Sequence, residues 1–469
     1  MQFMNFGKFF RKHKIGVIIF LLALAVRLTL FVVNFNAAQG NFIETIRGAD
    51  GYYEISRNLI DGNGYSFDQG PVFTPEPLRP PVWIFFMAFL AKIFGSYVPV
   101  FIFEVIIGSL IPVIGMSLAA RVVSLRLATA VGVFLALEPN GVLLSFLTIS
   151  EIPFTFLFLL FLFFLFRYFD SQTTRNIVWS GVFLGLAILV KPTVQFFPLL
   201  VPIALFLIYK KIKSVPPILY KHCAYFFLVS VLVLTPWFYR NYREFGAIGL
   251  SAQPAFNLYL VLVPTVLSIE NGTTYNDEFV KNQAITDAIG GGITLTNSDF
   301  YIKKALGVLL EHKVALIRSV AVSVVTFFTH DGMLTVLSYS KISIPNLLEK
   351  PAIMLFFSEP QTLIRHIVAY AGSSGIVVFI FRLFWIAVTF LFFVGALFYF
   401  RSEKFSPFAC IALGVVIYFA LLTAVNGFGM NARFRIPVTA FMVTFSVYGV
   451  SVLWKFAKNR LAKPRPLLK

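Results

Sequence analysis

Long uninterrupted apolar runs limit what this chain can fold into more than any other feature. The runs at 15–35 and 376–400 hold one charged side chain each, Arg27 and Arg382. As helices, both are long enough to cross a hydrocarbon core about 30 Å thick. Only 13% of the residues are charged, against roughly 25% in soluble domains. A soluble protein of this size needs more surface charge, so we predict an all-α integral membrane protein.

About ten transmembrane helices are predicted on the same grounds. The first run is too long for the core of a cleaved signal peptide, so we expect a retained signal anchor. Two further apolar stretches, 81–94 and 314–329, are expected to lie at the membrane interface or to pack on the bundle. The predicted spans are 15–35, 98–119, 127–145, 149–168, 177–190, 192–209, 223–238, 376–400, 406–424 and 436–454.

The positions of the basic residues predict the orientation. With the N-terminus in the cytoplasm, the cytoplasmic connections and both chain ends collect Lys and Arg, whereas the short outer connections hold almost none. If exactly one of the stretches 81–94 and 314–329 crossed the membrane, the basic tail would face outward. The predicted cytoplasmic set is Lys8, Arg11, Lys12, Lys14, Arg121, Arg126, Arg167, Arg175, Lys210, Lys211, Lys213, Lys221, Arg401, Lys404, Lys455, Lys458, Arg460, Lys463, Arg465 and Lys469.

This orientation accounts for the net charge of +18. Basic side chains gather where a membrane protein meets anionic lipid heads and the cytoplasm, so we expect membrane lipid and no nucleic acid as a partner. We predict a multi-pass protein of a bacterial inner or cell membrane with both termini in the cytoplasm. One domain, 1–469, then has two long segments on the outer face, 36–97 and 239–375. Segments of this length are usually functional or disordered.

The first outer segment carries two side chains that suit chemistry. Asp50 precedes a short helix that Gly62 would end, and it reads either as the N-cap of that helix or as a catalytic carboxylate. Arg79 stands before two prolines, which stiffen the chain and begin the next helix. Arg79 reads either as a ligand for an anion or as an arginine that snorkels to the membrane interface.

Two charged residues near predicted span ends add to these candidates. Glu151 opens the fourth span, where an acid at membrane depth is a functional candidate and a carboxylate favoured by the helix dipole is the alternative. Lys191 either caps a broken helix pair or meets a phosphate. The five His residues show no metal-binding spacing, so no metal site is predicted, although a divalent ion is not excluded.

Several short motifs follow one another along the chain. They are Asp-x-x-Tyr at 50–53, Arg-Asn-Leu-x-x-Gly-x-Gly-Tyr at 57–65, Arg-Pro-Pro at 79–81, Thr-x-Ser-Glu at 148–151, Lys-Pro-Thr at 191–193, Pro-Trp-x-x-Arg-Asn-Tyr-Arg-x-Phe-Gly at 236–246, Asn-Leu-Tyr at 257–259 and Arg-Phe-Arg-Ile-Pro at 433–437. In this order they resemble the polyprenyl-phosphate-sugar-dependent glycosyltransferases of the GT-C fold. These enzymes include the dolichyl-phosphate-mannose protein mannosyltransferases and the lipid A aminoarabinose transferases.

The resemblance covers nearly the whole chain, and it implies a GT-C-like bundle with outer loops and interfacial helices. It also implies a donor in which a sugar is linked to a lipid phosphate, undecaprenyl phosphate in bacteria or dolichyl phosphate elsewhere. The sugar would move to an envelope lipid, glycan or protein outside the cytoplasm. The segment 36–97 would then hold the catalytic loop. Region 265–375 is the least matched, so 239–375 is expected to form the acceptor side.

Roles for individual residues follow from the resemblance. Asp50 matches the acid of the first loop, and a general base contributes roughly 10²–10⁴-fold. Arg79 matches the basic residue near the donor phosphate, with Arg240 and Arg435 as further candidates, because a guanidinium pairs two phosphate oxygens. A possible second acid or substrate contact would come from Glu54, Glu151, Tyr53 and Lys191.

One departure from the family pattern concerns metal and mechanism. Many members carry a second acid directly after the first, where this chain has Gly51, so Glu44, Glu54 or Glu151 would have to supply it. Phosphate is a stable leaving group that needs no general acid, unlike the glycosidase pair, so we expect direct displacement with inversion. Two other classes stay open: a transporter or flippase for a lipid-linked saccharide or solute, and a polysaccharide polymerase or ligase.

Overall fold

The computed structural model describes residues 6–212, 215–290, 292–343, 352–402, 406–428 and 431–461, and these residues form helices without a strand. In a hydrocarbon core every backbone N–H and C=O must be paired inside its own segment, and helices achieve this. Five of the predicted basic residues, Lys213, Lys404, Lys463, Arg465 and Lys469, lie outside the described residues.

Seven of the described helices are long and apolar enough to span a membrane. They are α1 (Phe6–Ala37), α5 (Val98–Ala119), α8 (Glu151–Ser171), α11 (Ile218–Phe245), α20 (Ile376–Ser402), α21 (Pro407–Thr423) and α22 (Asn431–Leu461). An eighth span arises if α16 (Lys313–Thr329) and α17 (Met333–Tyr339), which meet at a 68° bend, count as one broken span. The prediction of a multi-pass helical membrane protein is therefore confirmed.

The remaining predicted spans are shorter helices of the same bundle. The range 127–145 is divided into α6 (Leu125–Leu137) and α7 (Pro139–Leu144), because Pro139 favours an extended conformation for the preceding Glu138, whose ψ is 114°. The range 177–190 is α9 (Thr174–Ile188). The range 192–209 is η1 (Pro192–Val194) followed by α10 (Phe197–Ile212). The stretch 81–94 is α4 (Pro81–Phe94), which packs on α3 and α5.

The stretch 314–329 belongs to the bundle rather than to its surface. It forms α16, which packs against α20, α21 and α22 and contributes Phe327 and Phe328 to the large core. Of the two placements expected for it, packing on the bundle is the one observed.

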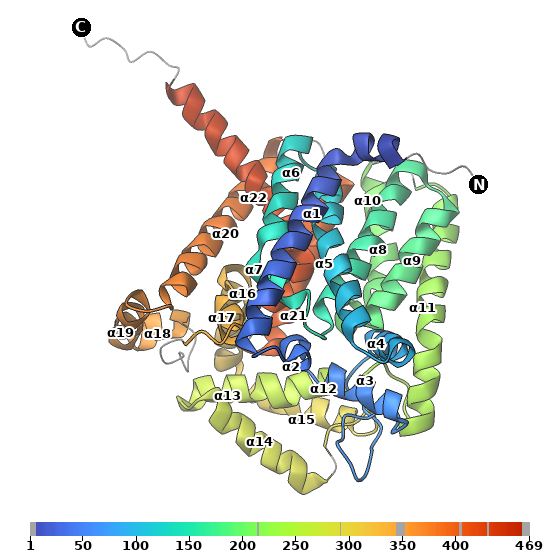
Figure 1. Ribbon diagram of the computed structural model, residues 1–469, viewed down its shortest axis with the longest axis vertical. Coiled ribbons are helices and arrows are strands. Elements are labelled where there is room, and N and C mark those ends of the chain that lie inside the picture. Colours follow the sequence, from blue (N-terminus) through green and yellow to red (C-terminus); the bar gives the residue numbers. More distant parts are fainter. Residues whose placement is uncertain are drawn as a thin grey trace.

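Short helices cover one end of the bundle, at the bottom of Figure 1, while the start of α1 and the end of α22 lie at the opposite end. We call the end that the short helices cover the covered end. It joins the two long predicted outer segments, because its helices come from both 36–97 and 239–375. A second, smaller core around Tyr259 and Tyr301 holds part of it together. Its helices are α2 (Phe42–Ile46), α3 (Tyr52–Asp61), α12 (Gln253–Phe256), the π-helical η2 (Asn257–Leu262), α13 (Val263–Asn271), α14 (Tyr275–Ile289) and α15 (Ser298–Glu311).

Three further elements complete the region around the cavity described below. The chain returns from α17 through α18 (Ala352–Ser358) and α19 (Pro360–Ala371) to α20. The single turn η3 (Ala424–Asn426) lies between α21 and α22 and contacts η2.

Candidate active site

A cavity of about 1210 Å³ opens between the covered end and the membrane helices. Its wall combines polar side chains from several elements with a long apolar surface. The polar and charged members include Asp50, Tyr52, Arg79, Ser150, Lys191, Gln253, Asn257, His330, His366, Arg382, Asn426 and Arg433. The apolar members include Phe196, Leu334, Ile367, Val378, Phe379, Phe419, Leu422 and Phe434.

Asp50 lies beside Glu151 because two segments about a hundred residues apart in sequence are joined by hydrogen bonds. The N–H of Thr148 donates to the carbonyl of Ile46 at 2.8 Å, and the N–H of Gly48 donates to the Thr148 hydroxyl at 3.4 Å. A Cβ on Gly48 would lie 2.2 Å from Ile149 Cγ2, so only glycine permits this approach. The motifs at 50–53 and 148–151 therefore form one site.

Gly51 has a structural reason to replace the second acid of the family pattern. It adopts φ 80° before α3, a conformation that favours glycine, and a Cβ there would lie 2.6 Å from the Phe67 ring. The N-cap of α3 is Gly51 itself and has no side-chain cap bond. Reading Asp50 as a helix N-cap is thus wrong, whereas Gly62 ends α3 as expected.

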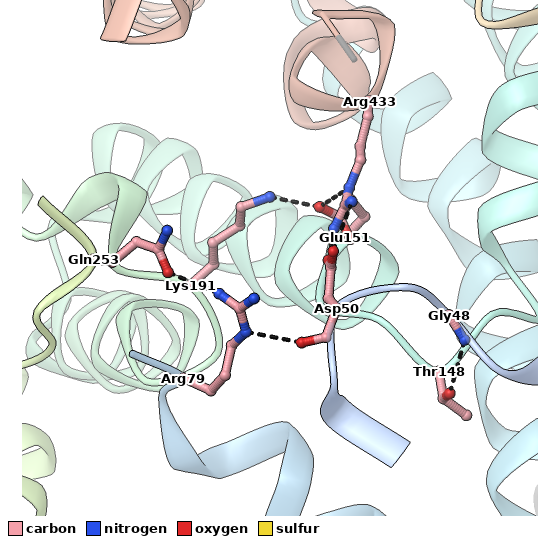
Figure 2. Close-up of polar contacts among 8 residues, drawn as sticks. All are labelled: Gly48, Asp50, Arg79, Thr148, Glu151, Lys191, Gln253 and Arg433. Atoms are coloured by element: carbon pink, nitrogen blue, oxygen red, sulfur yellow. Dashed lines mark hydrogen bonds and ion pairs between the residues drawn. The ribbon is translucent and has the colours of Figure 1, made fainter. Parts of the chain in front are cut away.

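The carboxylate of Asp50 forms an ion pair with Arg433, the third residue of α22. Arg433 Nε also donates to Glu151 Oε1, which accepts a second hydrogen bond from Lys191 Nζ at 2.6 Å. Figure 2 shows these four side chains converging from four separate segments of the chain. Glu151 is buried and is not one of the described residues that line the cavity. Its carboxylate therefore neutralises Arg433 and Lys191 from the side that faces away from the cavity.

Arg79 is held on the other side of Asp50 by neutral acceptors. Its Nε donates to the backbone carbonyl of Asp50 at 2.9 Å and its Nη1 to Gln253 Oε1 at 2.8 Å (Figure 2). The Tyr65 hydroxyl fixes the backbone by donating to the carbonyls of Arg79 and Pro80. Three cations now face two carboxylates, and the excess positive charge suits an anion.

These charges set the protonation state of Asp50. Burial acts to raise the pKa of its carboxyl, but the charge of Arg433, hydrogen bonding to it, and the charges of Arg79 and Lys191 outweigh burial and lower the pKa to about 2. Asp50 is therefore ionised at neutral pH. Burial raises the pKa of the neighbouring Tyr52 to about 12, so its hydroxyl stays protonated.

Two of the predicted phosphate ligands lie away from this cluster and outside the described cavity wall. The Arg240 guanidinium packs over Trp237 and Tyr65 and donates to the Glu76 carbonyl at 3.2 Å. The Arg435 guanidinium is buried 3.5 Å from the centre of the Trp385 ring. It donates to three carbonyls at the end of α16, those of Phe327, Phe328 and His330. Arg435 thus caps α16 at its bend.

Tyr53 and Glu54 also point away from the cavity. Glu54 forms an ion pair with Arg47, whose guanidinium also lies over the Tyr53 ring. Glu44 pairs with Lys341 at 2.6 Å. Of the three acids that could stand in for the missing second carboxylate, the structure brings only Glu151 to Asp50.

The cavity-facing residues that sequence reasoning missed include Arg433, Tyr52 and Gln253. In a helix, residues two apart point in nearly opposite directions, so Arg433 and Arg435 cannot both face the cavity. The motif at 433–437 indicated that an arginine of this segment belongs to the site. Only the rotation of α22 about its axis determines which of its two arginines faces the cavity. Among the described residues no group of three or more His, Cys, Asp and Glu could hold a metal. The sequence-based expectation of no metal site, with a divalent ion not excluded, stays a prediction.

Comparisons with known proteins place this architecture in a known class. Residues 78–239, about a third of the chain, match the family model of dolichyl-phosphate-mannose-protein mannosyltransferase. A search of curated proteins finds no significant match.

Solved structures give the fold. The archaeal oligosaccharyltransferase AglB from Archaeoglobus fulgidus, in complex with an inhibitory peptide and a dolichol-phosphate, aligns with a TM-score of 0.51 and 17% identity over 98% of this chain. A second AglB structure, tethered with an acceptor peptide, gives a TM-score of 0.53 and 14% identity over 98% of this chain. This chain spans about half of each AglB chain, 53% and 52% respectively. ArnT from Cupriavidus metallidurans aligns with 14% identity over 95% of this chain and 80% of that one, with a TM-score of 0.38.

The shared fold with AglB and the mannosyltransferase family match confirm the predicted resemblance to the GT-C class.

Proposed function

We propose that this multi-pass membrane protein is a GT-C glycosyltransferase that transfers a sugar from a polyprenyl-phosphate donor to an acceptor hydroxyl at the covered end. The observation that carries the proposal is the composition of the cavity that holds Asp50 and Arg79. The Asp50 carboxylate lies on its polar wall beside the cations Arg79, Lys191 and Arg433, and the same cavity continues along apolar side chains such as Phe379 and Phe419. A ligand with an anionic head and a long apolar tail fits such a wall.

Arg79 is the strongest candidate for the donor phosphate. Its described hydrogen bonds go to neutral oxygens, whereas Arg433 and Lys191 already contact carboxylates. A guanidinium can pair two phosphate oxygens, and stabilising the negative charge that develops on the leaving phosphate is often the largest catalytic contribution. Arg433 and Lys191 would add to this positive field. Arg240 and Arg435, which the motifs suggested as phosphate ligands, would not contact the phosphate. They would instead hold the backbone of the cavity wall in place.

Asp50 is the proposed general base. It would accept the proton of an acceptor hydroxyl while that oxygen forms a bond to the anomeric carbon and the bond from this carbon to the phosphate oxygen breaks. The electron pair leaves on the lipid phosphate. Attack opposite the leaving group inverts the anomeric carbon, and an NMR spectrum of the product that shows retention would contradict this assignment.

The tight ion pair with Arg433 makes Asp50 a weak base until substrate arrives, because a good base has a pKa near the working pH. A bound phosphate would compete for Arg433 and loosen its hold on Asp50. Binding of the donor would thereby raise the basicity of Asp50 at the moment it is needed.

The acceptor is proposed to be an envelope lipid, glycan or protein on the extracytoplasmic face, the side that the basic residues predict for the covered end. AglB was solved with an inhibitory peptide and with a tethered acceptor peptide, which supports the proposal that this fold binds an acceptor as well as a lipid donor. The least matched part of the second outer segment, 265–375, is the proposed acceptor side, and it supplies cavity residues from α14, α16, α17 and α19.

The experiment is transfer by the purified full-length protein, using radiolabelled polyprenyl-phosphate sugars and crude envelope acceptors. Asp50→Asn should lower the rate by roughly 10²–10⁴-fold, the contribution of one general base. Asp61→Asn is the matched control, since Asp61 is an exposed acid at the end of α3. Full activity in Asp50→Asn would move the base to another acid. If the wild-type protein transfers no sugar but carries the lipid across vesicles, the transporter hypothesis replaces the enzyme.

A further inference from the structure

Three side-chain amides form a continuous row along the cavity wall next to Arg79. Gln253 Nε2 donates a hydrogen bond to Asn257 Oδ1 at 2.7 Å, and Asn257 Nδ2 donates to Asn426 Oδ1 at 3.0 Å. All three residues line the cavity. We call Gln253, Asn257 and Asn426 the amide row. It joins the consecutive elements α12 and η2 to η3, which lies about 170 residues further along the sequence.

Arg79 fixes the direction of every amide in the row. A guanidinium can only donate, so Gln253 must present its oxygen to Arg79, where the distance is 2.8 Å. Its nitrogen must then donate to Asn257, and Asn257 in turn to Asn426. Amide oxygen and nitrogen are normally interchangeable without such a reference. Here a single cation determines all three orientations.

The three amides, all of which line the cavity, keep hydrogen-bonding capacity beyond the bonds named above. Each carbonyl accepts one bond within the described part of the chain, although an amide oxygen has two lone pairs. Each nitrogen likewise retains at least one N–H. Donors and acceptors therefore alternate along the wall in a fixed order, and this pattern is complementary to hydroxyl groups, which both donate and accept.

The backbone beneath the amide row is held firmly. Asn257 begins the π-helical turn η2, and π-turns are frequent at functional sites. The Tyr275 hydroxyl donates to the Leu260 carbonyl at 3.2 Å and Asn282 Nδ2 to the Tyr259 carbonyl at 3.0 Å. Both donors come from α14, so this helix satisfies carbonyls of the irregular turn. A rigid turn keeps the amides in one geometry and lowers the entropy cost of binding.

We infer that the amide row recognises hydroxyl groups of the donor sugar, and that Arg79 couples this recognition to the phosphate. The inference rests on the proposed function, and it adds the residues that read the sugar. In the donor, the sugar is bonded directly to the phosphate. A phosphate on Arg79 therefore places the sugar ring next to Gln253, which Arg79 itself contacts. A wall that only held a polyprenyl tail would need no amides.

The test compares binding of bare undecaprenyl phosphate with undecaprenyl phosphate carrying glucose, mannose, galactose or N-acetylglucosamine. Affinities are measured on the full-length protein in detergent by competition with a fluorescent undecaprenyl phosphate analogue. The variants are Asn257→Ala, Asn426→Ala and Asn257→Leu, which removes both polar atoms of the amide with little change in size and no change in charge. Asn459→Ala, an exposed amide at the far end of α22, is the matched control.

Wild-type protein should bind at least one sugar-bearing lipid more tightly than the bare lipid. Each variant of the amide row should lose roughly 3- to 10-fold for that lipid, the effect of about one net hydrogen bond, with less than a 2-fold change for the bare lipid. Equal losses for both ligands, or none, would overturn the inference and leave the proposed function intact. Unchanged donor binding with a raised KM for the acceptor would also overturn it, by assigning the amide row to the acceptor. No binding of any of these lipids by wild-type protein would overturn both proposals.

Discussion

At the scale of single residues, the pairing of Asp50 with Arg433 governs the chemistry that the cavity can perform. The pKa of Asp50 is lowered to about 2, below its ordinary value. A depressed acid contributes stability that is present above the ordinary pKa and is lost as pH falls through about 2. At neutral pH the carboxylate is therefore charged and paired, and its charge also favours the folded state.

A pH profile separates the role of Asp50 from that of its neighbours. In wild type, kcat/KM should show no acid limb from Asp50 above about pH 4, because the group is already ionised there. Arg433→Gln removes the largest charge that opposes burial, so the acid limb should move to higher pH. Arg243→Gln, at the exposed end of α11, should leave the profile unchanged. An unmoved acid limb in Arg433→Gln would show that the titrating base is another group.

Arg79 and Arg240 can be distinguished by kinetics and stability. Arg79→Ala should raise the KM for the donor at least 10-fold, because it removes a charged contact to phosphate that is worth about 1.5–3 kcal/mol. Arg240→Ala should instead lower the unfolding temperature, since it removes packing on Trp237 and Tyr65 and a hydrogen bond to Glu76. A large rise in donor KM for Arg240→Ala without loss of stability would restore it as a phosphate ligand.

At the scale of helices, the crossing with α20 helps to position α22, the helix that carries Arg433 near its start. The helices touch at two glycines: a Cβ on Gly395 would lie 1.8 Å from the Phe445 carbonyl oxygen, and one on Gly449 would lie 2.4 Å from the Leu391 oxygen. Small residues let membrane helices approach at backbone distance. This contact holds the helix that carries Arg433 against the helix that carries Arg382.

Enlarging this contact should act on stability and on the site together. Gly395→Val must push α20 and α22 apart, and overpacking of this kind costs about 1–3 kcal/mol or more. Thermal unfolding in detergent should shift to lower temperature, and the transfer rate should fall because Arg433 moves relative to Asp50. Gly414→Ala on α21 is the control, since an added Cβ there meets nothing within 4 Å. An unaltered unfolding temperature in Gly395→Val would contradict the crossing.

At the scale of the whole molecule, the arrangement in Figure 1 agrees with a chain whose two long outer segments meet. The segments 36–97 and 239–375 both supply helices to the covered end, and the start of α1 and the end of α22 lie at the other. The pair α16 and α17 bends by 68°, which fits either a broken span or a re-entrant loop, and the predicted orientation requires the re-entrant loop if α4 does not cross the membrane.

The orientation itself can be checked by cysteine labelling of intact cells. In a chain with Cys223→Ser and Cys410→Ser, Asn276→Cys on α14 should react with a membrane-impermeant maleimide. Ser171→Cys, at the end of α8, should react only after the cells are opened. The expected result follows from the basic residues near α8, which favour the cytoplasm. The reverse labelling pattern would place the covered end inside the cell.

The sequence by itself determined the membrane class, most of the helices and the positions worth examining. Apolar run length, charge distribution and the ordered motifs need no tertiary information, because the bilayer imposes them on each segment separately. Asp50, Arg79, Glu151 and Lys191 were found in this way, and the structure brings all four together.

Only the tertiary structure decided which of two nearby residues of the same type serves the cavity. Tyr52 rather than Tyr53, and Arg433 rather than Arg435, line it because helix phase points neighbouring side chains to different sides. The pairing of Asp50 with Glu151 depends on hydrogen bonds between segments about a hundred residues apart, and the amide row on contacts across about 170. Such contacts form through packing of elements distant in sequence, and no local pattern in a single chain encodes them.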